Sequence, residues 1–172
     1  VRSSRKKWGA AARLFLRFSE RCFVQFCDRL TSVSKFKATA RGFGAREAAI
    51  GYVPNGIVEA GVDTAFTDPL LAEHRLPAGS FLLFACGRLD STKGLHTLLD
   101  AYERAGTDEP LLMIGDFTHD RDYAAAMERR IAALAGGSKR VCVVRTLLPR
   151  ERLLRVLRSA RLLVFPSEYE AM

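Results

Sequence analysis

The stretch from residue 81 to residue 94 reads FLLFACGRLDSTKG, and it indicates the fold class of the chain. The apolar run Phe81–Cys86 has the length of a buried strand. A polar loop, Gly87–Gly94, follows it, and a helical pattern begins near Lys93. A strand that leads into a helix within a few residues is typical of α/β folds with a parallel sheet.

The same alternation continues to the end of the chain. Further apolar runs occur at Leu111–Ile114, Val141–Val144 and Leu162–Phe165. The intervening segments repeat apolar residues on one helical face, at Leu95, Leu98, Leu99 and Tyr102, at Ala124, Met127, Ile131 and Leu134, and, from Pro149 onward, at Leu153, Val156, Leu157 and Ala160. Strands that are apolar on both faces indicate a parallel sheet covered by helices on both sides. We therefore predict an α/β fold in the order β-α-β-α-β-α-β.

Composition and charge exclude several classes of protein. The chain has 172 residues, of which 48% are hydrophobic, and no run approaches the roughly 18 apolar residues of a membrane-spanning helix. Residues 1–50 contain 12 Lys and Arg against three acidic residues, a balance of +9, whereas residues 51–172 have a balance of −1. A nucleic-acid-binding domain carries its basic patch on the folded surface, so we expect no nucleic-acid partner. The asymmetry predicts a boundary near residue 50.

The basic first segment contains one predicted long helix. Leu14, Phe15, Phe18, Cys22 and Phe26 share one stripe, and arginines lie mostly off it. Such a helix fits either an anionic membrane surface, contacted through residues 1–30, or another domain. We favour packing on another domain, because globular amphipathic helices are far commoner. The glycine-rich stretch from Gly42 to Gly56 predicts a connector.

Four cysteines are too few for a disulfide scaffold. Cys86 and Cys142 lie in predicted strands and are interpreted as core thiols of a reducing compartment, which favours a cytoplasmic location. Cys22 and Cys27 lack metal-ligand spacing. Interruption of the apolar start by Arg13 and Arg17 argues against a secretory signal.

The loop Gly87–Gly94 carries two cations, Arg88 and Lys93, beside a predicted helix start. Exposed N–H groups and the helix dipole favour an anion there, so the loop predicts a diphosphate site. The alternative is that Arg88 pairs with Asp90 or Asp100 and that Lys93 is solvated. A nucleotide triphosphatase P-loop is excluded, because its glycine-lysine order and following hydroxyl residue are absent.

Other strand-end residues carry weaker signals. Gly115 would let a ligand or a neighbouring backbone come close. Asp120 and Asp122 have the spacing of a metal-binding pair, but acidic residues at a helix start are favoured by the dipole, so we expect no metal site. The histidines, His74, His96 and His119, have no partner at catalytic spacing.

Four ordered motifs resemble the donor half of a family-4 retaining glycosyltransferase of the GT-B fold. These are VPNGI at residues 53–57, GRL with a following KG at residues 87–94, MIGD at residues 113–116 and PSEYE at residues 166–170. The resemblance implies a Rossmann-like donor domain over residues 51–172 that is truncated at its C-terminus. It also implies that residues 1–50 are the helical tail of an N-terminal acceptor domain, and that the chain is part of a longer protein.

The resemblance further implies which residues act. Arg88 and Lys93 would hold the diphosphate and stabilise the leaving group, Glu170 would bind sugar hydroxyls, and the loop from Arg145 to Pro149 would lie near the nucleobase. The implied catalytic residues are Arg88, Lys93 and Glu170, and the implied donor-binding residues are Gly87, Arg88, Lys93, Gly115, Asp116, Thr146, Leu147 and Glu170. The partners would be a nucleotide-diphosphate sugar and an unidentified hydroxyl acceptor, with no cofactor and no metal. Alternatives are a non-catalytic α/β nucleotide-binding or interaction module and another GT-B enzyme, such as a sugar-nucleotide epimerase.

Overall fold

The computed structural model describes residues 9–33, 42, 44, 46, 49–56, 66–137 and 139–168. These residues belong to two compact units, one ending at residue 56 of the described chain and one beginning at residue 66. Each unit is described by itself.

The second unit is built on a four-stranded parallel sheet with the strand order β5-β4-β3-β6. Its elements follow one another as α3 (Pro69–Glu73), β3 (Leu82–Cys86), the 3-10 helix η3 (Ser91–Lys93), α4 (Leu95–Arg104), β4 (Leu111–Gly115), α5 (Arg121–Ala135), β5 (Val141–Val144), α6 (Arg150–Ser159) and β6 (Leu162–Leu163). The predicted α/β fold with a parallel sheet is thereby confirmed.

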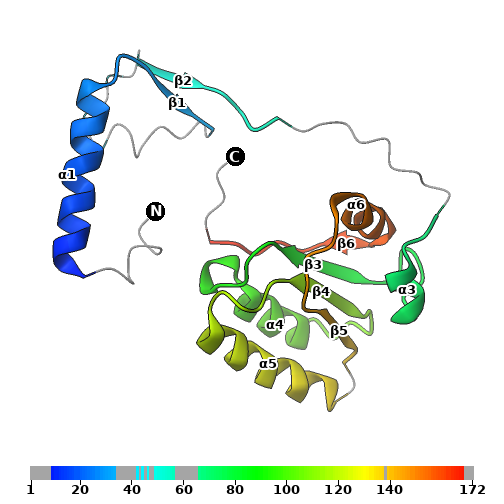
Figure 1. Ribbon diagram of the computed structural model, residues 1–172. Coiled ribbons are helices and arrows are strands. Elements are labelled where there is room, and N and C mark those ends of the chain that lie inside the picture. The colour runs from blue at the N-terminus through cyan, green and yellow to red at the C-terminus, as the bar shows by residue number, and fades with distance from the viewer. Residues whose placement is uncertain are drawn as a thin grey trace. The chain divides into compact units, whose positions relative to one another are not determined.

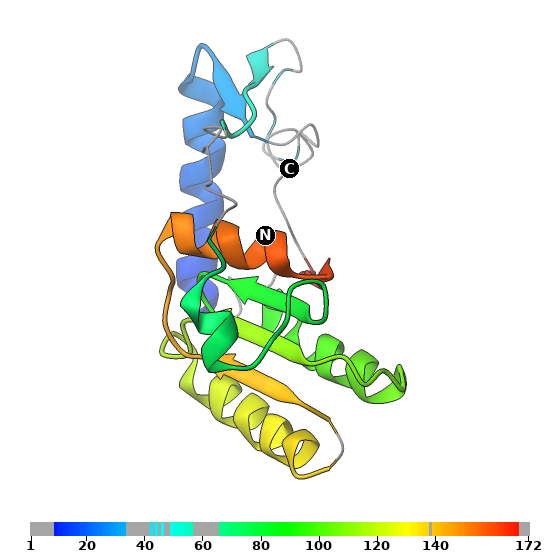
Figure 2. The ribbon, with the colours of Figure 1, turned by 90° about the vertical axis from the view of Figure 1, so that its right-hand side faces the viewer.

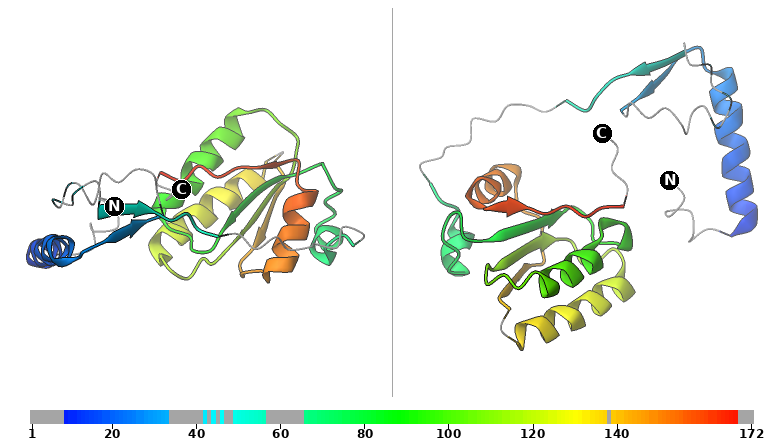
Figure 3. Two further views of the ribbon diagram at one scale, coloured as in Figure 1. Left: turned by 90° about the horizontal axis from the view of Figure 1, so that it is seen from above. Right: turned by 180° about the vertical axis from the view of Figure 1, so that it is seen from behind.

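Helices cover both faces of this sheet, as predicted. In Figure 1, α4 and α5 lie on one face and α6 lies on the other, and Figures 2 and 3 show the same layers from three further directions. Alternate strand residues separate the two cores: Phe84 and Met113 pack with α4 and α5, whereas Leu83 and Leu112 pack with α3 and α6. This division follows from the two-residue period of a strand, and it explains why the strands are apolar throughout.

The helix starts differ slightly from the sequence prediction. The turn Ser91–Lys93 is a separate 3-10 helix, and α4 begins only at Leu95. Gly94 divides the two because its φ of 69° lies in the left-handed region, which a glycine adopts without strain. The predicted helix starts at Asp120 and Pro149 are confirmed within one residue, since these two residues are the N-caps of α5 and α6.

The first unit contains α1 (Ala10–Phe26), β1 (Leu30–Ser32) and β2 (Ile50–Tyr52). The two strands pair in parallel, and both were missed, because strands of three residues give too short an alternation to recognise. The interpretation of residues 50–52 as part of a connector was therefore wrong. The predicted helix is confirmed, and the side chains of Leu14, Phe15 and Phe18 on its stripe are exposed.

Within the described part of the chain, every helix is too short or too polar to cross a bilayer.

Candidate functional site

The strand order contains a switch point between β3 and β6, where the direction in which successive strands are added to the sheet reverses. From β3 the chain passes through β4 to β5 on one side, and β6 then returns to the other side of β3. Because β3 and β6 are neighbouring parallel strands, the loops that follow them lie next to each other at the carboxyl edge. In open α/β sheets, ligands bind at such a switch point. The loop Gly87–Gly94 lies here, and so does the segment Val164–Glu168.

Two close contacts join this loop to this segment. The N–H group of Glu168 donates to the carbonyl of Thr92 at 2.9 Å. A Cβ atom on Gly94 would lie only 2.1 Å from the carbonyl oxygen of Pro166, so only glycine permits this approach. The loop and the segment thus form one joined structure at the switch point.

Asp90 organises the loop. One carboxylate oxygen accepts a hydrogen bond from the N–H of Thr92 at 3.0 Å, and its carbonyl accepts one from the N–H of Lys93 at 3.1 Å. The other carboxylate oxygen accepts from Nε of Arg88 at 3.1 Å. Asp90 is therefore the N-cap of η3 and contacts both cation-bearing residues.

Arg88 has the pairing that we considered as the alternative to ligand binding. Its partner is Asp90, whereas Asp100 pairs with Arg130. The Arg88 side chain is nevertheless 58% exposed, and the described bond uses only its Nε. The terminal guanidinium nitrogens carry further donors. Burial alone would raise the pKa of Asp90, but hydrogen bonds from Thr92 and Arg88 outweigh it and lower the pKa below the usual aspartate value.

Lys93 is half-buried and lies beside an aromatic ring. Its ammonium nitrogen is 5.4 Å from the ring centroid of Phe165, the second residue after β6. This distance is within the range of a cation–π interaction. Both predicted cations therefore lie on the switch-point loop, and each has a described partner.

Gly115 and Asp116 support the loop from the neighbouring strand. A Cβ atom on Gly115 would lie 3.0 Å from the carbonyl oxygen of Cys86 and 2.9 Å from its sulfur. Of the two neighbours expected for this glycine, a ligand or a backbone, the structure shows the backbone of the adjacent strand. The carbonyl of Asp116 accepts from the N–H of Leu89 at 2.9 Å. Hydrogen bonds from Thr118 lower the pKa of the Asp116 carboxylate. These two residues hold the loop in the described structure.

Cys86 ends β3 directly before the loop and is buried. Burial raises the pKa of its thiol to about 11, so the thiol is neutral near pH 7. Cys86 is a core thiol, as predicted for this strand.

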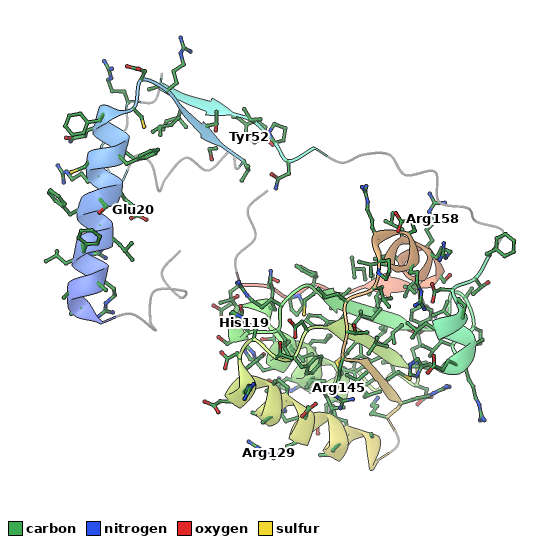
Figure 4. The ribbon with its side chains drawn as sticks, viewed as in Figure 1. Glu20, Tyr52, His119, Arg129, Arg145 and Arg158 are labelled. Carbon is green, nitrogen blue, oxygen red and sulfur yellow. The ribbon has the colours of Figure 1, made fainter. Side chains whose placement is uncertain are left out.

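Thr146 and Leu147 follow β5 and are exposed at the same sheet edge. We call Gly87–Gly94 the cation loop. Since β5 is two strands from β3, the loop that carries Thr146 and Leu147 is about 10 Å from the cation loop across the sheet. Arg145, labelled in Figure 4, pairs with Glu128 of α5 at 2.8 Å. The parallel sheet thus places seven of the eight predicted donor-binding residues at one edge.

The eighth predicted residue, Glu170, lies outside the described residues. Of the histidines, His119 is exposed before α5 (Figure 4), and His96 contacts the hydroxyl of Tyr123 at 2.9 Å. Asp120 caps α5 by accepting from the N–H of Tyr123 at 3.4 Å. Within the described chain, no three His, Cys, Asp or Glu side chains gather in the manner of metal ligands.

The sequence did not lead us to the roles of two site residues, Asp90 and Phe165. Asp90 was considered only as a competitor for Arg88, although an aspartate followed by Ser-Thr at the start of a short helix is a recognisable N-cap pattern. Phe165 was assigned only to a strand. Its contact with Lys93 joins residues 72 positions apart, and no local sequence pattern predicts such a contact.

Comparison with known proteins gives the family. The model of the family described as glycosyl transferases group 1 matches residues 67–172, which is more than half of the chain. No curated protein matches the chain in sequence.

Solved structures share the fold at low sequence identity. Sucrose-phosphate synthase of Thermosynechococcus elongatus matches all of this chain with a TM-score of 0.70 and 22% identity, over 42% of its own length. HepE of Anabaena, solved in complex with UDP, matches 90% of this chain with a TM-score of 0.68 and 17% identity, over 43% of its length. A glycosyltransferase of Rickettsia africae matches 87% with a TM-score of 0.66 and 16% identity, over 41%. The chain thus spans about two-fifths of these structures.

These likenesses support a GT-B type of fold, and the family model covers the whole described cation loop and its neighbouring strand ends. The chain belongs to the glycosyl transferases group 1 family.

Proposed function

We propose that the chain is the donor-binding part of a family-4-type retaining glycosyltransferase. It would move a sugar from a nucleotide-diphosphate donor to an acceptor hydroxyl without a metal ion. The observation that carries this proposal is the placement of Arg88 and Lys93 on the loop at the switch point.

The two cations suit a diphosphate. The Arg88 guanidinium can donate from its terminal nitrogens to phosphate oxygens in a planar, two-pronged geometry, and the Lys93 ammonium adds a compact positive charge. Negative charge grows on the diphosphate as the sugar leaves. Fixed positive charges therefore stabilise the transition state more than the ground state, which is the requirement for catalysis. The same charges would do the work that a bound cation does in metal-dependent transferases.

The remaining roles follow from the resemblance and the sheet edge. Glu170 would accept hydrogen bonds from hydroxyls of the transferred sugar, and the loop with Thr146 and Leu147 would lie beside the nucleobase. The separation of about 10 Å between the β3 and β5 loops is one that a nucleotide can bridge. The acceptor alcohol would attack on the face that the leaving group departs from, and a donor phosphate oxygen would take its proton.

Replacement of the cations tests this proposal. In the complete natural protein, Arg88→Ala and Lys93→Ala should each lower turnover by about 10²-fold, comparable to the loss of one oxyanion donor. Arg129→Ala is the matched control, because this arginine is exposed on α5 and has no proposed role. Turnover of either cation variant within a few-fold of the wild type would contradict the proposal.

The donor nucleotide can be identified by inhibition. HepE was solved with UDP and with UDP-glucose, which makes UDP the first nucleotide to test. We expect UDP to inhibit transfer more strongly than GDP or ADP. The same assay separates the alternatives: a non-catalytic module would bind the nucleotide without turnover, and an epimerase would convert the donor without an acceptor.

The first unit has a separate proposed role. We assign residues 1–50 to the tail of the acceptor domain, with the exposed stripe of α1 covered by that domain and the protein located in the cytoplasm. The competing possibility is that an anionic membrane surface contacts residues 1–30 and covers this stripe. Sedimentation of the complete protein with phosphatidylserine vesicles should leave it in the supernatant, and co-sedimentation that Phe15→Ser and Phe18→Ser abolish would favour the membrane.

A further inference from the structure

We infer that Phe165 is a positioning residue for Lys93: its ring holds the Lys93 ammonium at the end of β6, where the donor diphosphate is proposed to bind. This inference rests on the proposed function. It assigns a role to a side chain that has no polar atom and that no motif singles out.

The ring is placed firmly enough to act as a platform. Phe165 stacks on Phe84 with ring centroids 6.4 Å apart and an interplanar angle of 27°. Phe84 is 1% exposed and belongs to the core between the sheet and α4. Phe165 itself is 42% exposed. One ring is thus anchored in the core, and the other extends that core to the surface at the switch point.

The backbone brings Lys93 to this ring. The hydrogen bond from the N–H of Glu168 to Thr92 and the close approach of Gly94 to Pro166 fix the loop against the segment that carries Phe165. Thr92 and Gly94 are the sequence neighbours of Lys93, and Pro166 and Glu168 follow Phe165 closely. The backbone contacts therefore bring the two residues together, and their side chains meet with the ammonium 5.4 Å from the ring centroid.

An aromatic platform suits a lysine that must bind an anion. Free lysine side chains populate many rotamers, and ordering one at the moment of binding costs affinity. An aromatic face attracts the ammonium through its quadrupole and leaves its charge in place.

The test compares substitutions that keep or remove the aromatic face. In the complete natural protein, Phe165→Leu removes the face and keeps an apolar side chain, whereas Phe165→Tyr keeps the face, with its hydroxyl accommodated by the exposed position. Phe165→Met serves as a second non-aromatic variant if Phe165→Leu folds poorly. Phe66→Leu makes the same exchange at an exposed phenylalanine outside the site. Binding of UDP, GDP, ADP and inorganic pyrophosphate is measured by calorimetry, and folding by thermal denaturation.

We expect Phe165→Leu to weaken binding of the preferred nucleotide and of pyrophosphate by about five-fold, because a cation–π contact at a half-exposed site is worth roughly this factor. Phe165→Tyr and Phe66→Leu should stay within about two-fold of the wild type. In the Lys93→Ala background, Phe165→Leu should have no further effect. Equal weakening by Phe165→Leu and Phe165→Tyr, or additive effects with Lys93→Ala, would overturn the inference.

The same measurements separate this inference from the proposed function. If Lys93→Ala and Arg88→Ala both bind these ligands as the wild type does, the proposed function fails. If the two cation variants lose binding and Phe165→Leu binds normally, the proposed function stands and the role of Phe165 is wrong.

Discussion

Asp68 and Asp90 form nearly the same local structure at two places in the second unit. Each is the N-cap of a short helix, and each accepts a hydrogen bond from the N–H group two residues later, at 3.1 Å for Asp68 and 3.0 Å for Asp90. Each also accepts from the Nε atom of an arginine, Arg152 at 3.0 Å and Arg88 at 3.1 Å.

The two pairs differ in burial and in the origin of the arginine. Asp68 is fully buried, and Arg152 binds both of its oxygens from α6, 84 residues along the chain, with a second arginine, Arg155, at 3.6 Å. Arg88 comes from two residues before Asp90, makes one described bond and is 58% exposed. The first pair therefore fastens α3 to α6, whereas the second orders a loop and leaves a guanidinium accessible.

The comparison shows how one interaction serves two purposes. A buried carboxylate needs its arginine, because an unpaired buried charge is strongly destabilising. An exposed pair contributes little to stability, so its arginine can exchange partners when an anion binds. Burial, more than the identity of the residues, separates the structural pair from the candidate functional one.

The largest expected effects come from removing each arginine in turn. Arg152→Ala should lower the free energy of unfolding by about 3 kcal/mol, because buried Asp68 then keeps only the longer ion pair with Arg155 and loses both hydrogen bonds from Arg152. Arg88→Ala should lower it by less than about 0.5 kcal/mol, although it removes most turnover. Urea unfolding followed by circular dichroism measures both values in the complete natural protein. Equal destabilisation by the two variants would erase the distinction between the pairs.

A smaller effect is expected from the cap of the cation loop. Asp90→Ala removes the hydrogen bond to Thr92, a loss worth about 1 kcal/mol, and should weaken nucleoside diphosphate binding by about five-fold, because the loop that carries Lys93 loses its cap. Asp90→Asn should bind within about two-fold of the wild type, since asparagine caps about as well as aspartate. Calorimetric titration with UDP checks both variants. Indistinguishable affinities would show that the cap has no part in binding.

The smallest effect concerns acid stability. The hydrogen bond from Arg152 lowers the pKa of Asp68 below its usual value, against the opposing effect of burial. A lowered folded-state pKa means that the stabilisation is complete above the unfolded-state pKa, about 3.9, and is lost as the pH falls through the folded-state pKa. The free energy of unfolding should therefore drop below about pH 4, and Asp68→Asn should flatten this acid limb. An unchanged slope in Asp68→Asn would assign the acid sensitivity to other carboxylates.

Much of the second unit could be predicted because its patterns are local. The runs that became β3, β4 and β5 are continuous apolar stretches, and the face of α4 from Leu95 to Tyr102 repeats at helical spacing. The position of Arg88 and Lys93 after a strand likewise required only neighbouring residues. The three-residue strands β1 and β2 were missed, because they are too short to show a period.

The site could be predicted only in outline. Arg88 and Lys93 were chosen from the loop, and the cap at Asp90 was missed although its local pattern shows it, but the contact of Lys93 with Phe165 required coordinates. The buried ion pair of Asp68 and Arg152 could not be predicted from the sequence. An aspartate before a proline and an arginine on an amphipathic helix are surface residues in most proteins.

The sequence by itself determined the order of strands and helices, the parallel sheet and the strand-end position of the two cations, because each depends on periods and turns among contiguous residues. Only the tertiary structure decided that β6 lies beside β3, that Phe165 lies against Lys93 and that Asp68 is buried with Arg152. These outcomes depend on how distant segments share one core, and the free energy of that packing is summed over the whole chain.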